Sequence, residues 1–142
     1  MVGLTLFIGI ANANAQTWNS NIDKALKEAA SENKNVLLFF SVPEHCENCE
    51  ELEQNIFKSA EFNDFANSNY ILVKIDFSYQ SENLTPQTLE KNLLIVEKYN
   101  KDGFFPLVVI LNKNAKAIGK TGVYKKETPS EFITLLQSFN RA

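Results

Sequence analysis

The sequence has little of what metal centres and nucleic-acid surfaces are built from. Its 142 residues include two cysteines and a single histidine, His45, whereas a structural zinc site needs about four ligands. It contains no run of lysine or arginine, and its net charge of −3 argues against a surface for nucleic acid or anionic lipid. No repeat or low-complexity tract occurs. We therefore expect one globular domain that binds no metal, cofactor or nucleic acid.

Long hydrophobic runs are also missing, because none reaches the roughly 20 residues of a membrane span. The run from Val2 to Ile10 is followed by ANANAQ, in which Ala13-Asn14-Ala15 fits a cleavage site before Gln16. This pattern is typical of the second half of a secretory signal peptide without its basic start; a short buried helix or strand is the alternative. We expect residues 1–15 to be a signal peptide, truncated at its start, and residues 16–142 to form the mature domain in an oxidising compartment.

Hydrophobic periodicity predicts alternating helices and strands. Three apolar runs are typical of strands buried on both faces, and a weaker fourth strand follows them: NVLLFFSV, YILVKIDF, PLVVIL and AKAIGKTGV. Helices are expected from Trp18 to about Asn33, from Cys46 onward, and from Ser59 over SAEFNDFANSN. A further helix is expected from Thr85 to about Asn100, with Leu89, Leu93 and Val96 on its buried face. The last expected helix begins at the capping box TPSE at Thr128. This order predicts an α/β fold with a mixed central sheet of about four strands and helices on both faces.

Both cysteines lie in the stretch FFSVPEHCENCEELEQNIF. Cys46 follows a buried strand at the first turn of a helix, where free N–H groups and the helix dipole stabilise a thiolate. Cys49 lies one turn further along, more covered but within reach of Cys46. This arrangement favours a redox pair in which Cys46 attacks a partner disulfide and Cys49 resolves the mixed disulfide.

Other roles for the pair are weaker. Together with His45 the two cysteines supply at most three zinc ligands. A structural disulfide that closes so short a loop removes little chain entropy. A haem attachment site needs a histidine directly after the second cysteine, where Glu50 stands.

Over about residues 18–140 the chain resembles the thioredoxin-like superfamily, especially secreted bacterial members that read ENKPILLxF, CxxCKxLE, VF and EF in order. The matching segments are ENKNVLLFFSVPEHCENCEELEQNIFKSAEF, YILVKIDF and KYNKDGFFPLVVILNKNAKAIGKTG. The resemblance implies a thioredoxin-like fold and a periplasmic monomer. It also implies thiol–disulfide exchange with protein substrates and with an upstream thiol redox partner.

The same resemblance implies roles for individual residues. Cys46 and Cys49 would be the catalytic, redox-active pair. Pro106 would be a cis-proline opposite them, and Phe105, Pro106 and His45 would contact the substrate. A protonated His45 would favour the Cys46 thiolate, whereas the glutamates around the motif would disfavour it.

Several positions depart from the family pattern. His45 replaces the usual tryptophan, and Glu47-Asn48 replaces Gly-Pro or Gly-Trp between the cysteines. Phe39 and Phe40 occupy the region where the family has a buried aspartate, which leaves Lys74 without its usual partner. These departures keep open the alternative of a non-catalytic thioredoxin-like binding module that holds a partner chain.

Overall fold

The computed structural model describes residues 17–42, 44–76, 85–122 and 124–140, so the expected signal peptide lies outside the described residues. A single sheet has the strand order β1-β3-β2-β4-β5. Its strands are β1 (Trp18–Asn19), β2 (Asn35–Ser41), β3 (Tyr70–Asp76), β4 (Leu107–Leu111) and β5 (Ala117–Thr121). Strands β1, β3 and β2 run parallel, and β4 is antiparallel to both β2 and β5. The thioredoxin-like α/β fold is confirmed, with five strands instead of about four.

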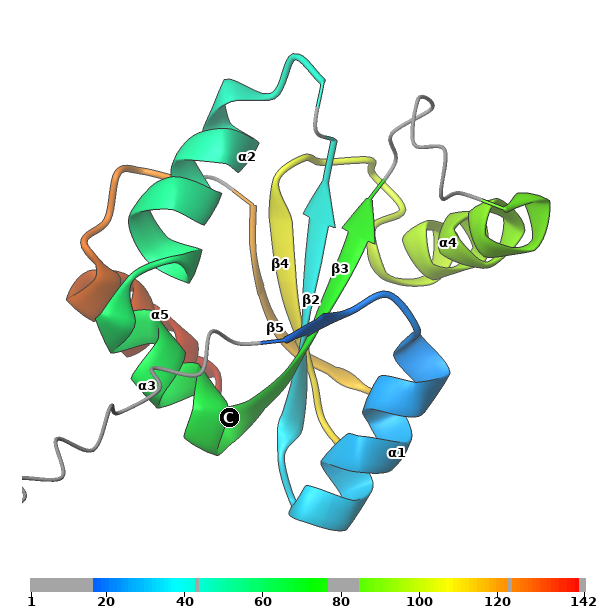
Figure 1. Ribbon diagram of the computed structural model, residues 1–142, viewed down its shortest axis with the longest axis horizontal. Helices are drawn as coiled ribbons and strands as arrows, with labels where there is room; N and C mark the ends of the chain where they lie inside the picture. Colours follow the sequence, from blue (N-terminus) through cyan, green and yellow to red (C-terminus); the bar gives the residue numbers. More distant parts are fainter. Residues whose placement is uncertain (1–16, 43, 77–84, 123, 141–142) are drawn as a thin grey trace, which may run out of the picture.

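Helices cover both faces of this sheet (Figure 1). They are α1 (Ile22–Glu32), α2 (Glu47–Leu52), its π-helical continuation η1 (Glu53–Phe57), α3 (Ala60–Asn69), α4 (Pro86–Tyr99) and α5 (Pro129–Phe139). Helices α2, α3 and α5 pack on one face, and α1 and α4 pack on the other. The expected starts at Ser59, Thr85 and Thr128 are confirmed, since each of these side chains accepts a hydrogen bond from the first turn of its helix.

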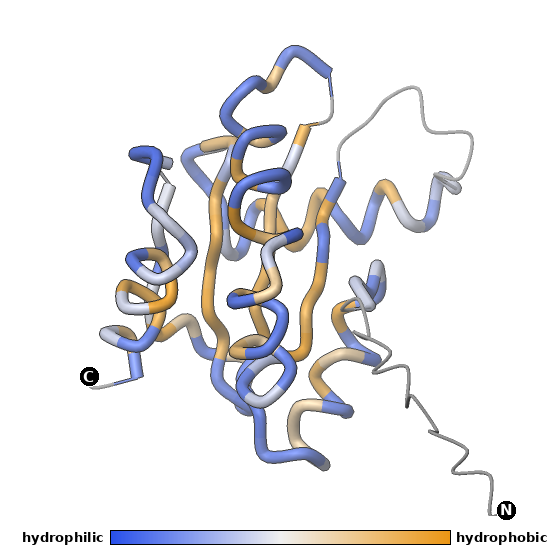
Figure 2. The backbone as a smooth tube through the Cα atoms, turned by 60° about the vertical axis from the view of Figure 1, so that its left-hand side comes forward, coloured by the Kyte–Doolittle hydropathy of each residue, from blue (hydrophilic) through white to orange (hydrophobic). Residues whose placement is uncertain are grey.

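Strand β2 joins the two cores. Leu37 and Phe39 point into the core under α2, α3 and α5, whereas Val36, Leu38 and Phe40 point into the core under α1 and α4. All five side chains are fully buried. The alternation follows from the two-residue period of a strand. Figure 2 shows apolar residues along the central strands and polar residues on the outer turns of the helices.

The predicted helix start at Trp18 is wrong. Trp18 and Asn19 pair with Leu72 and Val73 as an edge strand, and the helix begins at Ile22 after the N-cap Asn21. The indole of Trp18 packs against Phe57, with ring centroids 5.1 Å apart. Helical spacing in the sequence cannot show this, because the contact that fixes Trp18 comes from a residue far along the chain.

The predicted buried face of α4 is also partly wrong. Leu93 is 51% exposed, and the side chains fully covered by the sheet are Asn92 and Ile95. Leu89 and Val96 are half-buried against the same core. The contact face is therefore rotated by about one position, and Leu93 and Leu94 remain on the outer surface.

Tyr70 carries a buried hydroxyl at the start of β3. Its side chain is 3% exposed, and within the described residues its hydroxyl forms no hydrogen bond. Burial raises the pKa of Tyr70 to about 12; the neighbouring Asn140 side chain opposes this rise. The hydroxyl therefore costs stability at neutral pH and becomes harder to ionise in the folded protein.

Replacing Tyr70 by phenylalanine should raise the free energy of unfolding by about 1 kcal/mol at neutral pH, because a buried unpaired hydroxyl is removed. In the unfolded chain the hydroxyl ionises at its ordinary pKa of 10.0, below the folded value. The stability that the neutral Tyr70 hydroxyl retains in the wild type is therefore complete below pH 10.0 and is lost as the pH rises through the folded pKa. The variant should avoid about 1.4 kcal/mol of this loss at about pH 11.

Urea unfolding at about pH 8 and about pH 11 measures both effects. Tyr99→Phe is the matched control, because the Tyr99 hydroxyl donates a 2.8 Å hydrogen bond to the Ala115 carbonyl. This control should lose about 1 kcal/mol at either pH. Equal alkaline losses in Tyr70→Phe and wild type would contradict the assignment.

Candidate active site

The cysteine pair lies just beyond the carboxyl end of β2, at the start of α2. Cys46 is the N-cap residue of this helix, and its sulfur accepts a hydrogen bond from the Cys49 N–H at 3.2 Å. A disulfide joins Cys46 to Cys49, with an S–S distance of 1.99 Å and Cα atoms 5.2 Å apart. The start of the helix therefore directs a backbone N–H toward the sulfur of Cys46, as a thiolate there would require.

The two sulfur-bearing residues differ in exposure. Cys49 is 2% exposed and belongs to the core, together with Leu52 and Ile56 of the same helical stripe. Cys46 is half-buried and packs against the edge of this core. An incoming molecule therefore meets Cys46 first, while Cys49 is held behind it.

The segment that leads into β4 lies beside the same core. Phe105 is half-buried and packs, like Cys46, against the core under α2. The Phe105–Pro106 peptide bond is cis. Pro106 is buried and lines a small cavity with Leu52 of α2 and Tyr124. The fold thus brings Phe105 and Pro106 close to the helix that carries both cysteines.

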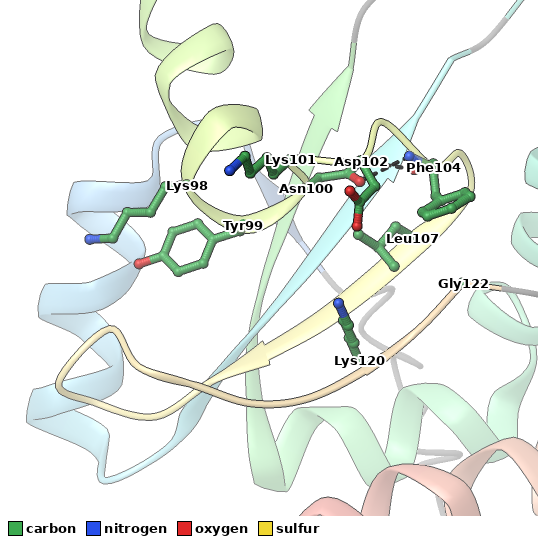
Figure 3. Close-up of a pocket in the computed structure, with 9 residues that line it drawn as sticks. All are labelled: Lys98, Tyr99, Asn100, Lys101, Asp102, Phe104, Leu107, Lys120 and Gly122. Atoms are coloured by element: carbon green, nitrogen blue, oxygen red, sulfur yellow. Dashed lines mark hydrogen bonds between the residues drawn. The ribbon is translucent and has the colours of Figure 1, made fainter.

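The loop before Phe105 is held by one buried side chain. Asn100, 3% exposed, donates a 2.8 Å hydrogen bond to the Phe104 carbonyl and accepts one of 3.0 Å from the Phe104 N–H (Figure 3). Gly103, with φ of +70°, donates from its N–H to the Asn100 carbonyl. These bonds fix Phe104 on the surface directly before Phe105.

His45 stands next to Cys46 in a different environment. Its side chain is exposed, and its backbone adopts the left-handed conformation with φ of +60°. Among the described residues it forms no hydrogen bond or ion pair. The structure therefore places the imidazole beside the pair without fixing its orientation.

A charged pair near Cys49 was missed from the sequence. Glu53 lies one turn beyond Cys49 on the same helix, and its carboxylate is 2.5 Å from the Lys74 ammonium. The two side chains are 32% and 29% exposed, and the ammonium lies 5.9 Å from the ring centroid of Phe39. Lys74 therefore has a partner, supplied by the helix instead of the neighbouring strand. The four-residue spacing between Cys49 and Glu53 was the available signal in the sequence.

In the parts of the chain that the structure describes, no three His, Cys, Asp or Glu side chains gather closely enough to hold a metal ion. None of the described helices has both the length and the apolar character needed to cross a membrane.

The chain is similar to known proteins in both sequence and fold. The family model of the thioredoxin-like domain matches residues 22–139. Disulfide bond reductase DsbH of Chlamydia pneumoniae is 30% identical over 113 residues, which are 80% of this chain and 66% of that protein, slightly under two thirds of its length. A solved DsbH oxidoreductase superposes with a TM-score of 0.81 at 24% identity, covering 99% of this chain and 95% of the other. A disulphide isomerase from Xylella fastidiosa Temecula1 gives a TM-score of 0.63 at 21% identity, covering 84% of this chain and 88% of the other.

The Glu53–Lys74 pair should contribute measurably to stability. We expect a coupling free energy of about 1 kcal/mol between Glu53→Gln and Lys74→Met, because the pair is two-thirds covered and close. The exposed pair Lys24–Glu28, 3.9 Å apart on α1, is the matched control and should give about 0.3 kcal/mol. Urea unfolding of both double-mutant cycles makes the measurement. Equal coupling free energies in the two cycles would show that partial burial does not strengthen the Glu53–Lys74 pair.

Proposed function

The chain belongs to the thioredoxin-like domain family, and from this premise we propose that it is a thiol–disulfide oxidoreductase acting on protein substrates. One observation carries the proposal: a disulfide joins a half-exposed Cys46 at a helix start to a buried Cys49. This pair has the asymmetry that stepwise thiol exchange needs. The related protein named disulfide bond reductase favours reduction of substrate disulfides as the direction.

In the proposed reaction the Cys46 thiolate of the reduced protein attacks one sulfur of a substrate disulfide. The Cys46–substrate bond forms as the substrate disulfide breaks, and one substrate thiolate leaves and takes up a proton. Cys49 then loses its proton and attacks the sulfur of Cys46, which releases the second substrate thiol and restores the Cys46–Cys49 disulfide. Two electrons pass to the substrate, and an upstream thiol protein returns them to the pair.

Phe105 and Pro106 are proposed to bind the substrate beside Cys46. Both residues pack near α2, and the loop before them is held by Asn100. A substrate segment lying extended against them would present its disulfide to the half-exposed sulfur. Recognition of this kind uses the shape of the main chain, so it suits many protein substrates.

The site of action follows from the first residues of the sequence. We propose that residues 1–15 are a signal peptide and that residues 16–142 act as a monomeric thioredoxin-like domain in the bacterial periplasm. The apolar run before Ala13-Asn14-Ala15 supports this proposal. An oxidising compartment also supplies the disulfides on which the domain would act.

The second candidate is a thioredoxin-like binding module that holds a partner without exchanging disulfides. Phe39 favours it, because an apolar ring points toward the core around Cys49 where the family has an acid. Cysteine variants distinguish the two functions, since a binding module does not need its thiols.

We expect the reduced protein to reduce insulin disulfides when a thiol regenerates it, and Cys46→Ser to abolish this activity. Cys49→Ser should instead accumulate a mixed disulfide through Cys46, because attack remains possible and resolution does not. Non-reducing electrophoresis and mass spectrometry identify the trapped species. No reduction by wild type, together with retained partner binding in Cys46→Ser, would favour the binding module.

His45 should shift the redox equilibrium through its charge. Asparagine is the better replacement, because it tolerates the left-handed backbone at this position. In His45→Asn the potential should become about 10–20 mV more negative under conditions where the imidazole is protonated, since the reduced form loses a cation beside its thiolate. Glutathione equilibration measures both potentials, and identical values would show that His45 is only solvated.

A further inference from the structure

A groove lined by lysines lies next to the segment that leads into β4. It has a volume of about 420 Å³ and runs between the end of α4, the loop before Phe105 and β5 (Figure 3). Lys98, Lys101 and Lys120 line it, with Asp102 as the carboxylate among its lining residues. A second hollow of about 430 Å³ shares Lys98, Tyr99 and Lys120 and continues along β5. The chain as a whole has a net charge of −3, so this groove has the opposite sign from the rest.

The register of the sheet explains how Lys120 reaches this groove. Lys120 pairs with Val109 across the antiparallel β4–β5 ladder, and directly opposed residues share a face. Val109 points into the core under α1 and α4, so Lys120 stands on that face too. Figure 3 shows its side chain rising from β5 toward the loop that carries Lys101 and Asp102. The other face of β5 is covered by α5, whose Phe139 ring lies against Gly119.

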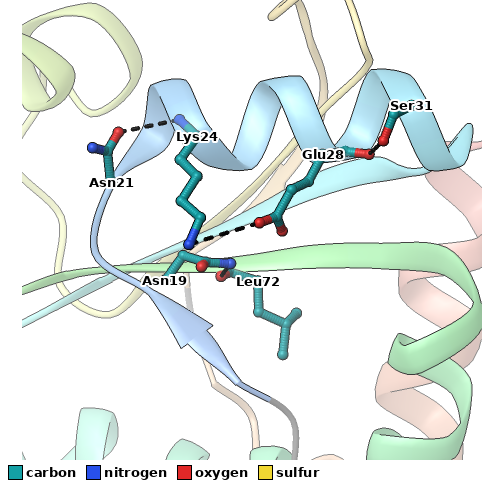
Figure 4. A network of polar contacts seen from close by, with 6 residues as sticks. All are labelled: Asn19, Asn21, Lys24, Glu28, Ser31 and Leu72. Atoms are coloured by element: carbon teal, nitrogen blue, oxygen red, sulfur yellow. Dashed lines mark hydrogen bonds and ion pairs between the residues drawn. The ribbon is translucent and has the colours of Figure 1, made fainter.

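Within the described residues, no ion pair involves the lysines of the groove, Lys98, Lys101 and Lys120. Lys98 instead lies 5.2 Å from the ring centroid of Tyr99. Four lysines elsewhere in the described residues do form ion pairs, for example Lys24 with Glu28 (Figure 4). Three cations around one hollow repel one another, so an anion bound there gains from all three.

Apolar groups accompany the charges. Phe104 is 61% exposed and lines the groove together with Leu107. The Asn100 hydrogen bonds hold the backbone of Phe104, so little loop entropy is lost when a ligand packs on it. Tyr99, fixed by its bond to the Ala115 carbonyl, lies at the end of the groove away from Phe104 (Figure 3). An occupant that matches both features is a polypeptide segment with carboxylates beside an apolar side chain.

The groove meets the proposed substrate site at one residue. Leu107 and Gly122 line the groove, and Gly122 also borders the small cavity formed with Pro106 and Leu52 of α2. A substrate segment that lies against Phe105 and Pro106 and continues past Gly122 would enter the lysine groove. We infer that the groove binds an acidic segment of the protein substrate, on one side of the disulfide to be exchanged. This inference rests on the proposed function and specifies its substrate class.

Paired disulfide peptides provide the kinetic test. Each carries the same disulfide, followed or preceded by a run of glutamates or of glutamines. Of the two acidic peptides, the one with its glutamates on the side of the groove should be reduced by wild type with kcat/KM about tenfold above that of its glutamine counterpart at low salt. This preference should shrink as salt is added. The double variant Lys101→Glu, Lys120→Glu should remove this preference. Lys27→Glu, an exposed lysine on α1, is the matched control and should keep it.

A binding measurement separates this inference from the proposed function. The oxidised wild-type protein is titrated with a cysteine-free acidic peptide, its glutamine counterpart and inorganic phosphate, while amide resonances are followed by NMR. The acidic peptide alone should shift the amides of Lys98, Lys101 and Lys120. If no disulfide is reduced but these shifts occur, the exchange function is wrong and the groove stands. If all disulfide peptides react equally and the acidic peptide causes no shift, or phosphate alone causes it, the groove inference is wrong and exchange stands.

Discussion

Strand β2 is buried on both faces and hydrogen-bonded along both edges, and the position of Cys46 depends on this burial. A slip of one residue would exchange Leu37 and Phe39 with Val36, Leu38 and Phe40 between the two cores, and the close packing of side chains of different size opposes this exchange. Cys46 follows the end of this strand after four residues. The half-exposed sulfur of Cys46 therefore lies beyond the carboxyl end of β2, where α2 begins.

Phe39 determines the surroundings of Cys49. Its ring packs 4.8 Å from that of Phe57 and faces the same core as Cys49, whereas Phe40 points to the opposite face. An aromatic ring at this position offers no group that accepts a proton. Glu53 lies one turn beyond Cys49, and it pairs with Lys74 at partial exposure. Water screens such a pair, so it acts more weakly on Cys49 than a fully buried acid would.

Features that depend on neighbouring residues could be predicted from the sequence. Apolar runs indicated β2, β3 and β4, and the capping residues Ser59, Thr85 and Thr128 fixed three helix starts. The helix expected from Cys46 onward is likewise present, as α2 and its continuation η1.

Features that depend on distant contacts could not be predicted in the same way. Trp18 joins the sheet because β3 and Phe57 lie beside it, and Leu93 faces outward because the sheet selects Asn92 and Ile95. The partner of Lys74 comes from a helix 21 residues earlier. The lysine groove is formed by α4, a loop and β5, which are separate in the sequence, so no local pattern of charge predicts it.

Net charge is a poor guide to what such a domain binds, because screening limits each charge to about 8 Å in physiological salt. The first turn of α2 is acidic, with Glu47 and Glu50 exposed beside Cys46, whereas the lysine groove lies on the face covered by α1 and α4. A partner that approaches the Phe105–Pro106 segment therefore meets opposite signs on the two faces of the sheet. Such an arrangement aligns a polar partner during encounter and contributes little to the thiol chemistry itself. Selection among substrates can thus change with a few surface lysines while the buried strand and the cysteine pair stay as they are.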